Sequence, residues 1–259
     1  MATIVCLPAP VEWNPTEAQA VVREWIRLLG GFQQTLSPER VVFCQGDVPQ
    51  DIFLLSRGLV ALKCNVADGR EAIVTVRFPG QMLDCCCHEL DVPYFASAHV
   101  VAESTVIRLS VAELRLQTVH NPDARALVDR LAHIDVYNAA TSVVALKTAS
   151  PACRFERFLR HFAAATGQAS DLESTGIVMP LRDPQLAEII GLSLRHFGRI
   201  KRELQVAGCM SVRGANRFVL RRPQHGTCTA YGESEGDACT LTGWKRDDER
   251  RSRLNMRRD

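Results

Sequence analysis

Three consecutive cysteines followed by a histidine, Cys85-Cys86-Cys87-His88, are the side chains of this sequence best suited to redox or metal chemistry. Thiolates are reactive nucleophiles and soft metal ligands, so the cluster suggests a thiol redox sensor or a metal or Fe–S site. Haem is a further alternative, with His88 or His99 as axial ligand. Against these interpretations, adjacent cysteines give poor bite angles for one tetrahedral ion, and buried cysteine commonly serves as a small hydrophobe. Inert packing and sensing both stay open.

A second group of side chains is basic and lies near the C-terminal end, in the segment 186–204. Gly191 offers a turn with positive φ, and Ser193 is a candidate N-cap for a helix that follows it. Apolar residues at helical spacing predict buried inner faces on both sides of this turn: Leu186, Ala187 and Ile190 before it, and Phe197, Ile200 and Leu204 after it. This spacing predicts a helix-turn-helix.

The outer face of the second helix and the segment behind it are rich in arginine. Residues 208–220 alternate in polarity around Gly214-Ala-Asn216 and predict a two-stranded wing. Arginine and histidine side chains on such a helix would meet base edges and phosphates in a major groove. The predicted DNA-binding residues are Ser193, Arg195, His196, Arg199, Arg202, Arg213 and Arg217.

Charge is distributed unevenly along the chain, although the formal net charge of the 259 residues is only +2. Residues 1–180 carry 15 Lys and Arg against 19 Asp and Glu, a net charge of −4, whereas residues 181–222 carry 9 against 3, a net charge of +6. A compact basic segment behind an acidic one indicates a polyanion-binding module attached to a part with another role.

The elements that would position these groups are indicated by changes of hydrophobic period. Residues 15–29 predict an amphipathic helix, with Asn14 as N-cap and Gly30-Gly31 as the stop. From about residue 35 to 110, short apolar runs punctuated by evenly spaced glycines predict an antiparallel barrel or sandwich. The expected strands are 41–43, 52–55, 59–62, 73–76, 98–102 and 106–109, with a hairpin turn at Asp68-Gly69.

A long helix is expected from Asn121-Pro122-Asp123 onward. Its apolar stripe Leu127, Leu131 and Ile134 predicts packing against a second copy of the helix, with packing on the chain's own barrel as the alternative. A further helix is expected at about 152–165.

We therefore expect an α+β chain with four parts. They are an antiparallel β-barrel sensor domain at 1–120, a dimerisation helix at 121–148, a winged helix-turn-helix domain at 149–223 and a disordered tail at 224–259.

Enzyme and membrane classes are not favoured by this sequence. It has no phosphate-binding loop of P-loop type, no Gly-x-Ser-x-Gly, no His-Glu-x-x-His and no dinucleotide fingerprint. Apolar stretches run about five residues, far short of a membrane span. The N-terminus lacks a secretory signal pattern, so ten cysteines fit a cytoplasmic, reduced protein.

The order of these features resembles the CRP/FNR family of bacterial transcription regulators over roughly residues 20–222. The segments that carry the resemblance are 36–47, 52–60, Asp68-Gly-Arg70, Phe78-Pro-Gly80, Asn121-Pro-Asp123 and 186–204. The resemblance implies a cyclic-nucleotide-binding-like double-stranded β-helix, a dimerising central helix and a winged helix-turn-helix. It also implies a homodimer on an inverted-repeat operator in double-stranded DNA, with RNA polymerase as a partner.

Two departures from the family pattern bear on the effector. Where cAMP-binding members place an Arg and a hydroxyl residue for the cyclic phosphate, this sequence has Tyr94-Phe95, and the hydroxyl pair of the long helix falls on Ala139-Ala140. A buried phosphodiester needs a cation and donors, so cAMP and cGMP are not expected to bind. The alternatives are a thiol redox, metal or haem sensor in which DNA contact is secondary, and an effector-free protein-interaction module.

Overall fold

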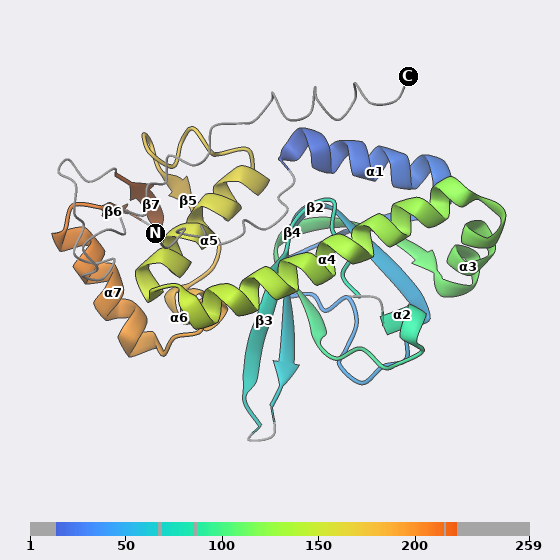
Figure 1. The fold of residues 1–259 in the computed structure, drawn as a ribbon, viewed down its shortest axis with the longest axis horizontal. Helices are drawn as coiled ribbons and strands as arrows, with labels where there is room; N and C mark the ends of the chain where they lie inside the picture. The colour runs from blue at the N-terminus through green and yellow to red at the C-terminus, as the bar shows by residue number, and fades with distance from the viewer. Residues whose placement is uncertain (1–13, 67–68, 85–86, 215, 222–259) are drawn as a thin grey trace, which may run out of the picture.

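The structure, a computed structural model, describes residues 14–66, 69–84, 87–214 and 216–221 (Figure 1). Its elements are α1 Pro15–Leu29, β1 Phe32–Leu36, β2 Asp51–Asn65, β3 Glu71–Arg77, α2 Cys87–Leu90, β4 Ser97–Ser110, α3 Val111–His120, α4 Pro122–Thr148, α5 Pro151–Ala165, β5 Ile177–Val178, α6 Asp183–Ile189, α7 Leu194–Val206, β6 Met210–Arg213 and β7 Arg217–Leu220. Cys85, Cys86, Asp68 and the expected tail at 224–259 lie outside the described residues.

Helix α1 confirms the helix predicted at 15–29. The Asn14 side chain accepts the Glu17 amide N–H at 3.0 Å, and the Glu17 carboxylate accepts the Asn14 N–H at 3.1 Å, so the first turn is closed by a reciprocal capping box. Trp25 on its inner face is fully buried. The helix ends at Gly30, whose φ of 74° suits a residue without Cβ.

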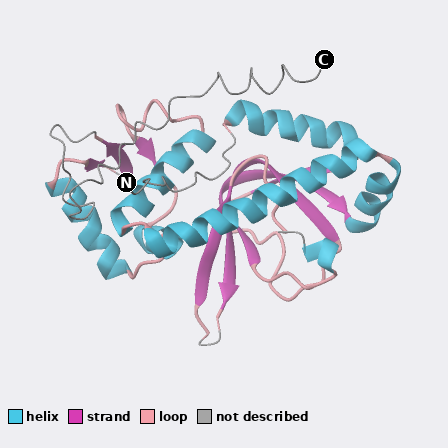
Figure 2. Ribbon diagram, in the orientation of Figure 1, coloured by secondary structure: helices cyan, strands magenta, loops and turns pink. Residues whose placement is uncertain are grey.

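The N-terminal sheet is antiparallel throughout, with strand order β1-β4-β2-β3. Figure 2 shows its strands in magenta. β2 is one strand rather than the two expected at 52–55 and 59–62. Gly58, at a φ of 98°, allows the ladder to slip in register there, because a Cβ would lie 2.2 Å from the Ser104 hydroxyl oxygen. The strands predicted at 52–55 and 59–62 are thus one strand, β2. The strands predicted at 98–102 and 106–109 are likewise one strand, β4.

The segment expected to form a strand at 41–43 makes only an isolated bridge, between Val41 and His99. Its backbone nevertheless pairs with β4, since Val42 N–H donates to the Ala98 carbonyl at 2.8 Å. On the other long strand, Leu83 N–H donates to the Phe53 carbonyl at 2.9 Å. β2 and β4 pair with each other, and each also has an outer edge. Along that edge, one half of the strand pairs with a regular strand and the other half pairs with an extended loop.

The long helix α4 begins after Asn121, whose side chain accepts the N–H of Asp123 and Ala124, and it confirms the helix predicted there. It crosses in front of the sheet and reaches from α3 to the C-terminal elements (Figure 1). No helix among the described residues is long and apolar enough to cross a membrane.

The stripe predicted to bind a second copy of α4 packs instead within this chain. Leu127 and Leu131 are each 3% exposed and belong to a core that includes Trp25 of α1 and Ile52 and Leu54 of β2. Ile134 is half-buried. The alternative, packing on the chain's own barrel, therefore holds for Leu127 and Leu131, because α1 covers this side of α4.

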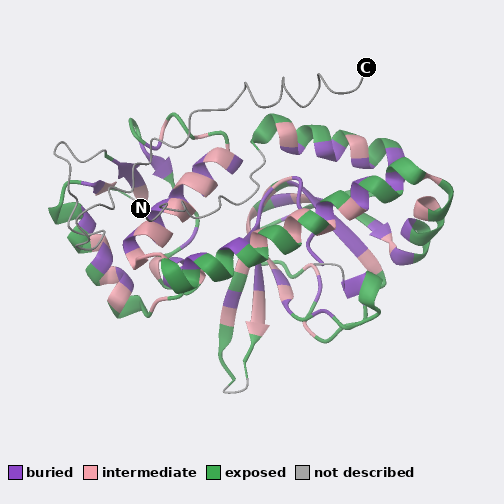
Figure 3. Ribbon diagram, viewed as in Figure 1, coloured by how far each residue is buried: buried purple, intermediate pink, exposed green. Residues whose placement is uncertain are grey.

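Exposed positions occur along the whole of α4 (Figure 3), and the large apolar residues among them lie toward its C-terminal end. They are Val136, Tyr137, Val143, Val144 and Leu146.

Candidate nucleic-acid interface

The turn between α6 and α7 has the geometry predicted from the sequence. Gly191 adopts a φ of 71°, which favours glycine, and a Cβ there would lie 2.8 Å from Cδ2 of Leu146 in α4. Ser193 caps α7, because its hydroxyl oxygen accepts the His196 N–H at 3.3 Å. The start of α7 is therefore held by its own capping residue and by the end of α4.

The two helices bury the faces that the apolar spacing predicted. Phe197 meets Phe155 of α5 edge-on, with ring centroids 4.9 Å apart, and Phe218 meets the same ring at 5.6 Å. The buried residues of this inner face are Leu186, Ala187, Ile190, Phe197, Ile200 and Leu204. Burial on this side directs the opposite side of α7 to solvent.

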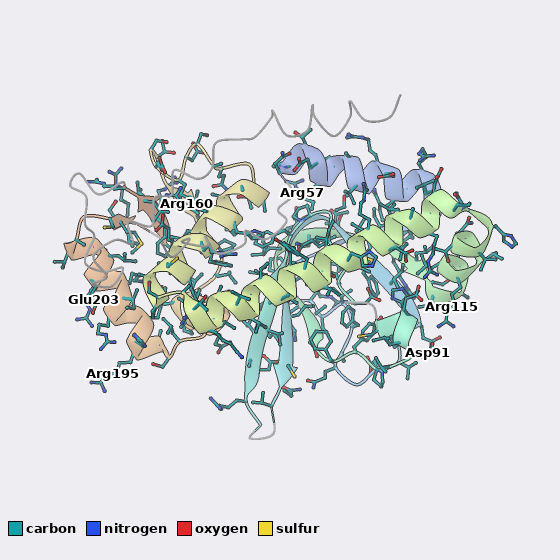
Figure 4. All side chains as sticks on the ribbon, in the orientation of Figure 1. Arg57, Asp91, Arg115, Arg160, Arg195 and Glu203 are labelled. Atoms are coloured by element: carbon teal, nitrogen blue, oxygen red, sulfur yellow. The ribbon has the colours of Figure 1, made fainter. Side chains whose placement is uncertain are left out.

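Basic side chains occupy that opposite side. Arg195, Arg199 and Arg202 are exposed and His196 is half-buried. Figure 4 labels Arg195 and Glu203 on this outer side of α7. The predicted helix residues line one shallow depression together with three that the sequence reasoning did not single out: Glu203, Val206 and Ala207.

Arg199 is held by neighbours on its own helix. Its Nη2 lies 2.9 Å from His196 Nε2, and its Nε lies 3.6 Å from the Glu203 carboxylate. A guanidinium only donates, so His196 accepts through Nε2 and carries its proton on Nδ1. Glu203 was missed, although its i+4 spacing from Arg199 is the signal that would have found it.

The β6–β7 hairpin places Arg213 and Arg217 directly opposite each other. Arg213 is exposed, whereas Arg217 is half-buried and donates from Nη1 to the Gly176 carbonyl at 3.1 Å. Asn216, at a φ of 56°, ties the turn back by donating to the carbonyls of Met179 and Leu181. Arg213 is therefore the freer of the two predicted hairpin arginines.

The two described residues of the cysteine–histidine cluster, Cys87 and His88, are buried. Cys87 and His88 are 4% and 2% exposed, and burial raises the pKa of the Cys87 thiol. His88 Nδ1 pairs with the Asp84 carboxylate, which is also buried. The described part of the chain contains no group of three His, Cys, Asp or Glu side chains placed to hold a metal ion. His99, on β4, faces Glu71 at 3.7 Å.

Tyr94 is a core residue. Its ring stacks on Phe43 with centroids 3.8 Å apart, and its hydroxyl donates to the Asp51 carbonyl at 2.6 Å. Burial raises the pKa of the Tyr94 phenol, so the side chain stays neutral. Phe95, the next residue, is 44% exposed.

Known proteins are similar to this chain in sequence and in fold. Residues 33–117 match the cyclic nucleotide-binding domain family. The nitrogen fixation regulation protein FixK of Azorhizobium caulinodans is 22% identical over 180 residues, which cover 70% of this chain and 71% of FixK. Residues 33–117 therefore contain a cyclic nucleotide-binding domain by sequence, and the chain is similar to FixK over a longer stretch.

Solved structures of two other bacterial proteins have a similar fold. FixK2 from Bradyrhizobium japonicum superposes with a TM-score of 0.63 at 16% identity, covering 75% of this chain and 94% of FixK2. A CRP-family transcriptional regulator from Thermus thermophilus has a TM-score of 0.60 at 17% identity, covering 73% and 92% of the two chains. By their names, FixK is a nitrogen fixation regulation protein and the Thermus protein is a transcriptional regulator.

Two arginines of the N-terminal sheet, Arg77 and Arg108, are already paired with carboxylates. Arg77 Nη1 binds the Asp135 carboxylate at 2.8 Å, and Arg108 Nη2 binds Asp51 at 2.7 Å. Ala139 and Ala140 are exposed on α4. A phosphate bound at the N-terminal sheet would therefore have to compete with Asp135 for the Arg77 guanidinium, or with Asp51 for that of Arg108.

Proposed function

We propose that the chain is a sequence-specific, DNA-binding transcription regulator of CRP/FNR type, acting as a homodimer. In this proposal residues 1–120 form the sensor, 121–148 the dimerisation helix and 149–223 a winged helix-turn-helix. Helix α7 is the recognition helix and the β6–β7 hairpin is the wing.

The observation that carries the proposal is the division of α7 into two faces. Phe197, Ile200 and Leu204 anchor it in the core, while Arg195, Arg199 and Arg202 face solvent. An exposed helix with a basic outer face fits a major groove, where arginine donates to guanine O6 and N7. The exposed Arg213 on the hairpin and the net charge of +6 over residues 181–222 add attraction for phosphate.

The dimer is assigned to the exposed part of α4 because Leu127 and Leu131 are committed to the chain's own core. Val136, Val143 and Leu146 are 68%, 52% and 49% exposed. Exposed apolar side chains spaced seven and three residues apart along one helix are typical of a helix that pairs with another helix. Such a pair would set two copies of α7 about one DNA turn apart, roughly 34 Å, and would require an inverted-repeat operator.

The effector is proposed to be something other than a cyclic nucleotide. Tyr94 fills the site where the resemblance expects a phosphate ligand, and its phenol provides no positive charge. Cys87 is a buried, protonated thiol, which disfavours it as the first nucleophile of a redox sensor.

DNA binding is tested by selecting genomic fragments with the purified protein and measuring affinity across a salt series. Affinity should fall steeply with salt, and Arg199→Ala should cost roughly 1–3 kcal/mol on the selected site. Arg57→Ala is the matched control, since Arg57 is an exposed arginine on β2, remote from α7 (Figure 4). Equal affinity of the wild type for selected and random DNA at every salt concentration would refute the proposal.

The dimer is tested separately by sedimentation. Val143→Asp places a charge in the proposed helix pair and should give monomers, whereas Leu131→Ala should lower stability and leave the dimer intact. A wild-type protein that is monomeric at micromolar concentration, with and without selected DNA, would contradict the assignment.

A further inference from the structure

The strand β3 lies at the edge of the N-terminal sheet, where the outward-facing backbone groups lack a neighbouring strand. One of these groups, the N–H of Ile73, donates at 3.1 Å to Oε2 of Glu188. Glu188 belongs to α6 and is 115 residues away in sequence. A carboxylate of the C-terminal part thus accepts a hydrogen bond from an edge-strand N–H of the N-terminal sheet.

Apolar packing surrounds this hydrogen bond. Ile73 and Phe78 belong to the same buried cluster as Leu186 and Ile190. Phe78 also meets the Phe162 ring of α5 edge-on, with centroids 6.1 Å apart. The C-terminal part is therefore docked on the sheet through a continuous core, in addition to its covalent connection through α4 and α5.

The other end of β3 is tied to α4. Arg77, the last residue of β3, pairs with Asp135 at 2.8 Å, and the two side chains are 9% and 10% exposed. β3 is thus fixed to α4 at one end and to α6 near the other.

A third contact joins the ends of α4 and α6 through α5. Arg154 of α5 donates from Nε to the Ile190 carbonyl and from Nη1 to the Ala149 carbonyl, both at 2.9 Å. Each of α4, α6 and β3 is therefore connected to the other two by side-chain contacts.

From this arrangement we infer that Glu188 is a positioning residue for DNA binding: by capping the edge strand β3, it sets the angle of α7 relative to α4. The inference rests on the proposed function. Glu188 does not line the depression at Arg195 and Arg199, and a carboxylate would repel phosphate, so it acts through β3 and not on DNA.

The expected consequence is specific to two-site binding. If α4 is the dimer axis, the angle between α4 and α7 fixes the separation of the two recognition helices. Loosening that angle lowers the effective concentration of the second helix at its half-site once the first is bound. A single half-site needs no such alignment and should be insensitive.

Glu188→Ala and Glu188→Gln form a matched pair for this test. Both variants remove the negative charge, but the amide oxygen of glutamine still accepts the Ile73 N–H. Affinities are measured for a selected inverted-repeat duplex and for a duplex with one intact half-site. We expect Glu188→Ala to lose about tenfold on the inverted repeat and less than about twofold on the half-site. Glu188→Gln should stay within about twofold of the wild type on both.

Amide hydrogen exchange of Ile73 tests the contact without DNA. Protection should be lost in Glu188→Ala and kept in Glu188→Gln, with thermal unfolding confirming that both variants are folded. If Ile73 stays protected in Glu188→Ala, or if the two variants bind the inverted repeat equally, the inference is overturned while DNA binding stands. If wild-type protein binds no duplex, the proposed function fails and the role of Glu188 in DNA binding fails with it, whatever the exchange result.

Discussion

Replacing Arg77 by methionine removes the cation of the buried pair between β3 and α4. The Asp135 carboxylate would then stay in the interior, 10% exposed, without its guanidinium partner. In the wild-type protein burial already raises the pKa of the Asp135 carboxyl, with a smaller contribution from the Asp84 charge, and Arg77 opposes both. Loss of Arg77 therefore raises the pKa of Asp135 further.

The expected cost follows from stranding one charge of a buried pair. Such changes destabilise proteins by roughly 3–5 kcal/mol at a pH where the remaining group is ionised. For a chain of this size, 1 kcal/mol shifts the Tm by about 2–4 °C, so a cost near 3 kcal/mol predicts a Tm lower by about 6–12 °C. The double variant Arg77→Met with Asp135→Asn removes the stranded charge and should recover most of this loss.

The pH dependence has a defined sign. A carboxyl whose pKa is raised in the folded state binds its proton more tightly there than in the unfolded chain, where the pKa is about 3.9. Its contribution to stability is therefore lost as the pH rises from the unfolded to the folded pKa. Arg77→Met should be most destabilised at pH 8 and closer to the wild type at pH 5. Calorimetric unfolding at both values refutes the reasoning if the single variant stays within about 2 °C of the wild type at pH 8, or if the double variant is no better.

Three further predictions use simpler assays. Leu131→Ala should lower the free energy of unfolding by about 2–5 kcal/mol, because Leu131 lies in the core beneath α1; a cost below about 1 kcal/mol in a denaturant titration would place it at a surface. Alkylation followed by peptide mass spectrometry should label the exposed Cys44 well before the buried Cys87, and equal rates would contradict the burial. Titration calorimetry should detect no saturable binding of cAMP or cGMP below about 100 µM, roughly −5.5 kcal/mol, and a saturable isotherm would mean that another group supplies the positive charge that Tyr94 lacks.

Local signals in the sequence predicted the elements whose boundaries depend on local interactions. Helix α1 has its capping box within four residues of sequence, and the turn at Gly191 with the Ser193 cap is equally local. The strands were predicted less well. The sequence pattern predicts a break between two strands at Gly58, whereas in the structure Gly58 permits a register shift inside β2. Only the pairing of β2 with β4 distinguishes the two cases.

Long-range contacts escaped prediction because periodicity shows that a face is apolar without showing what covers it. Leu127 and Leu131 were expected to meet a second chain, and α1 covers them instead. Glu188 and Asp135 reach partners 115 and 58 residues away, and nothing in the adjacent sequence marks either as paired. The outer face of α7 could be assigned from sequence because burial of its opposite face decides its direction.

The packing of α1 on α4 has a consequence for biosynthesis. Glu24 pairs with Arg130 at 2.8 Å and Trp25 packs in the same core as Leu127, so α1 leaves the ribosome well before the helix that it binds, which is made about a hundred residues later. At roughly 5–20 residues per second, the apolar side of α1 waits about 5–20 s for its partner. During that interval the nascent chain presents Trp25 and its neighbours to the folding machinery of the cell, and a chaperone that shields short apolar helices would act on it before the sheet closes.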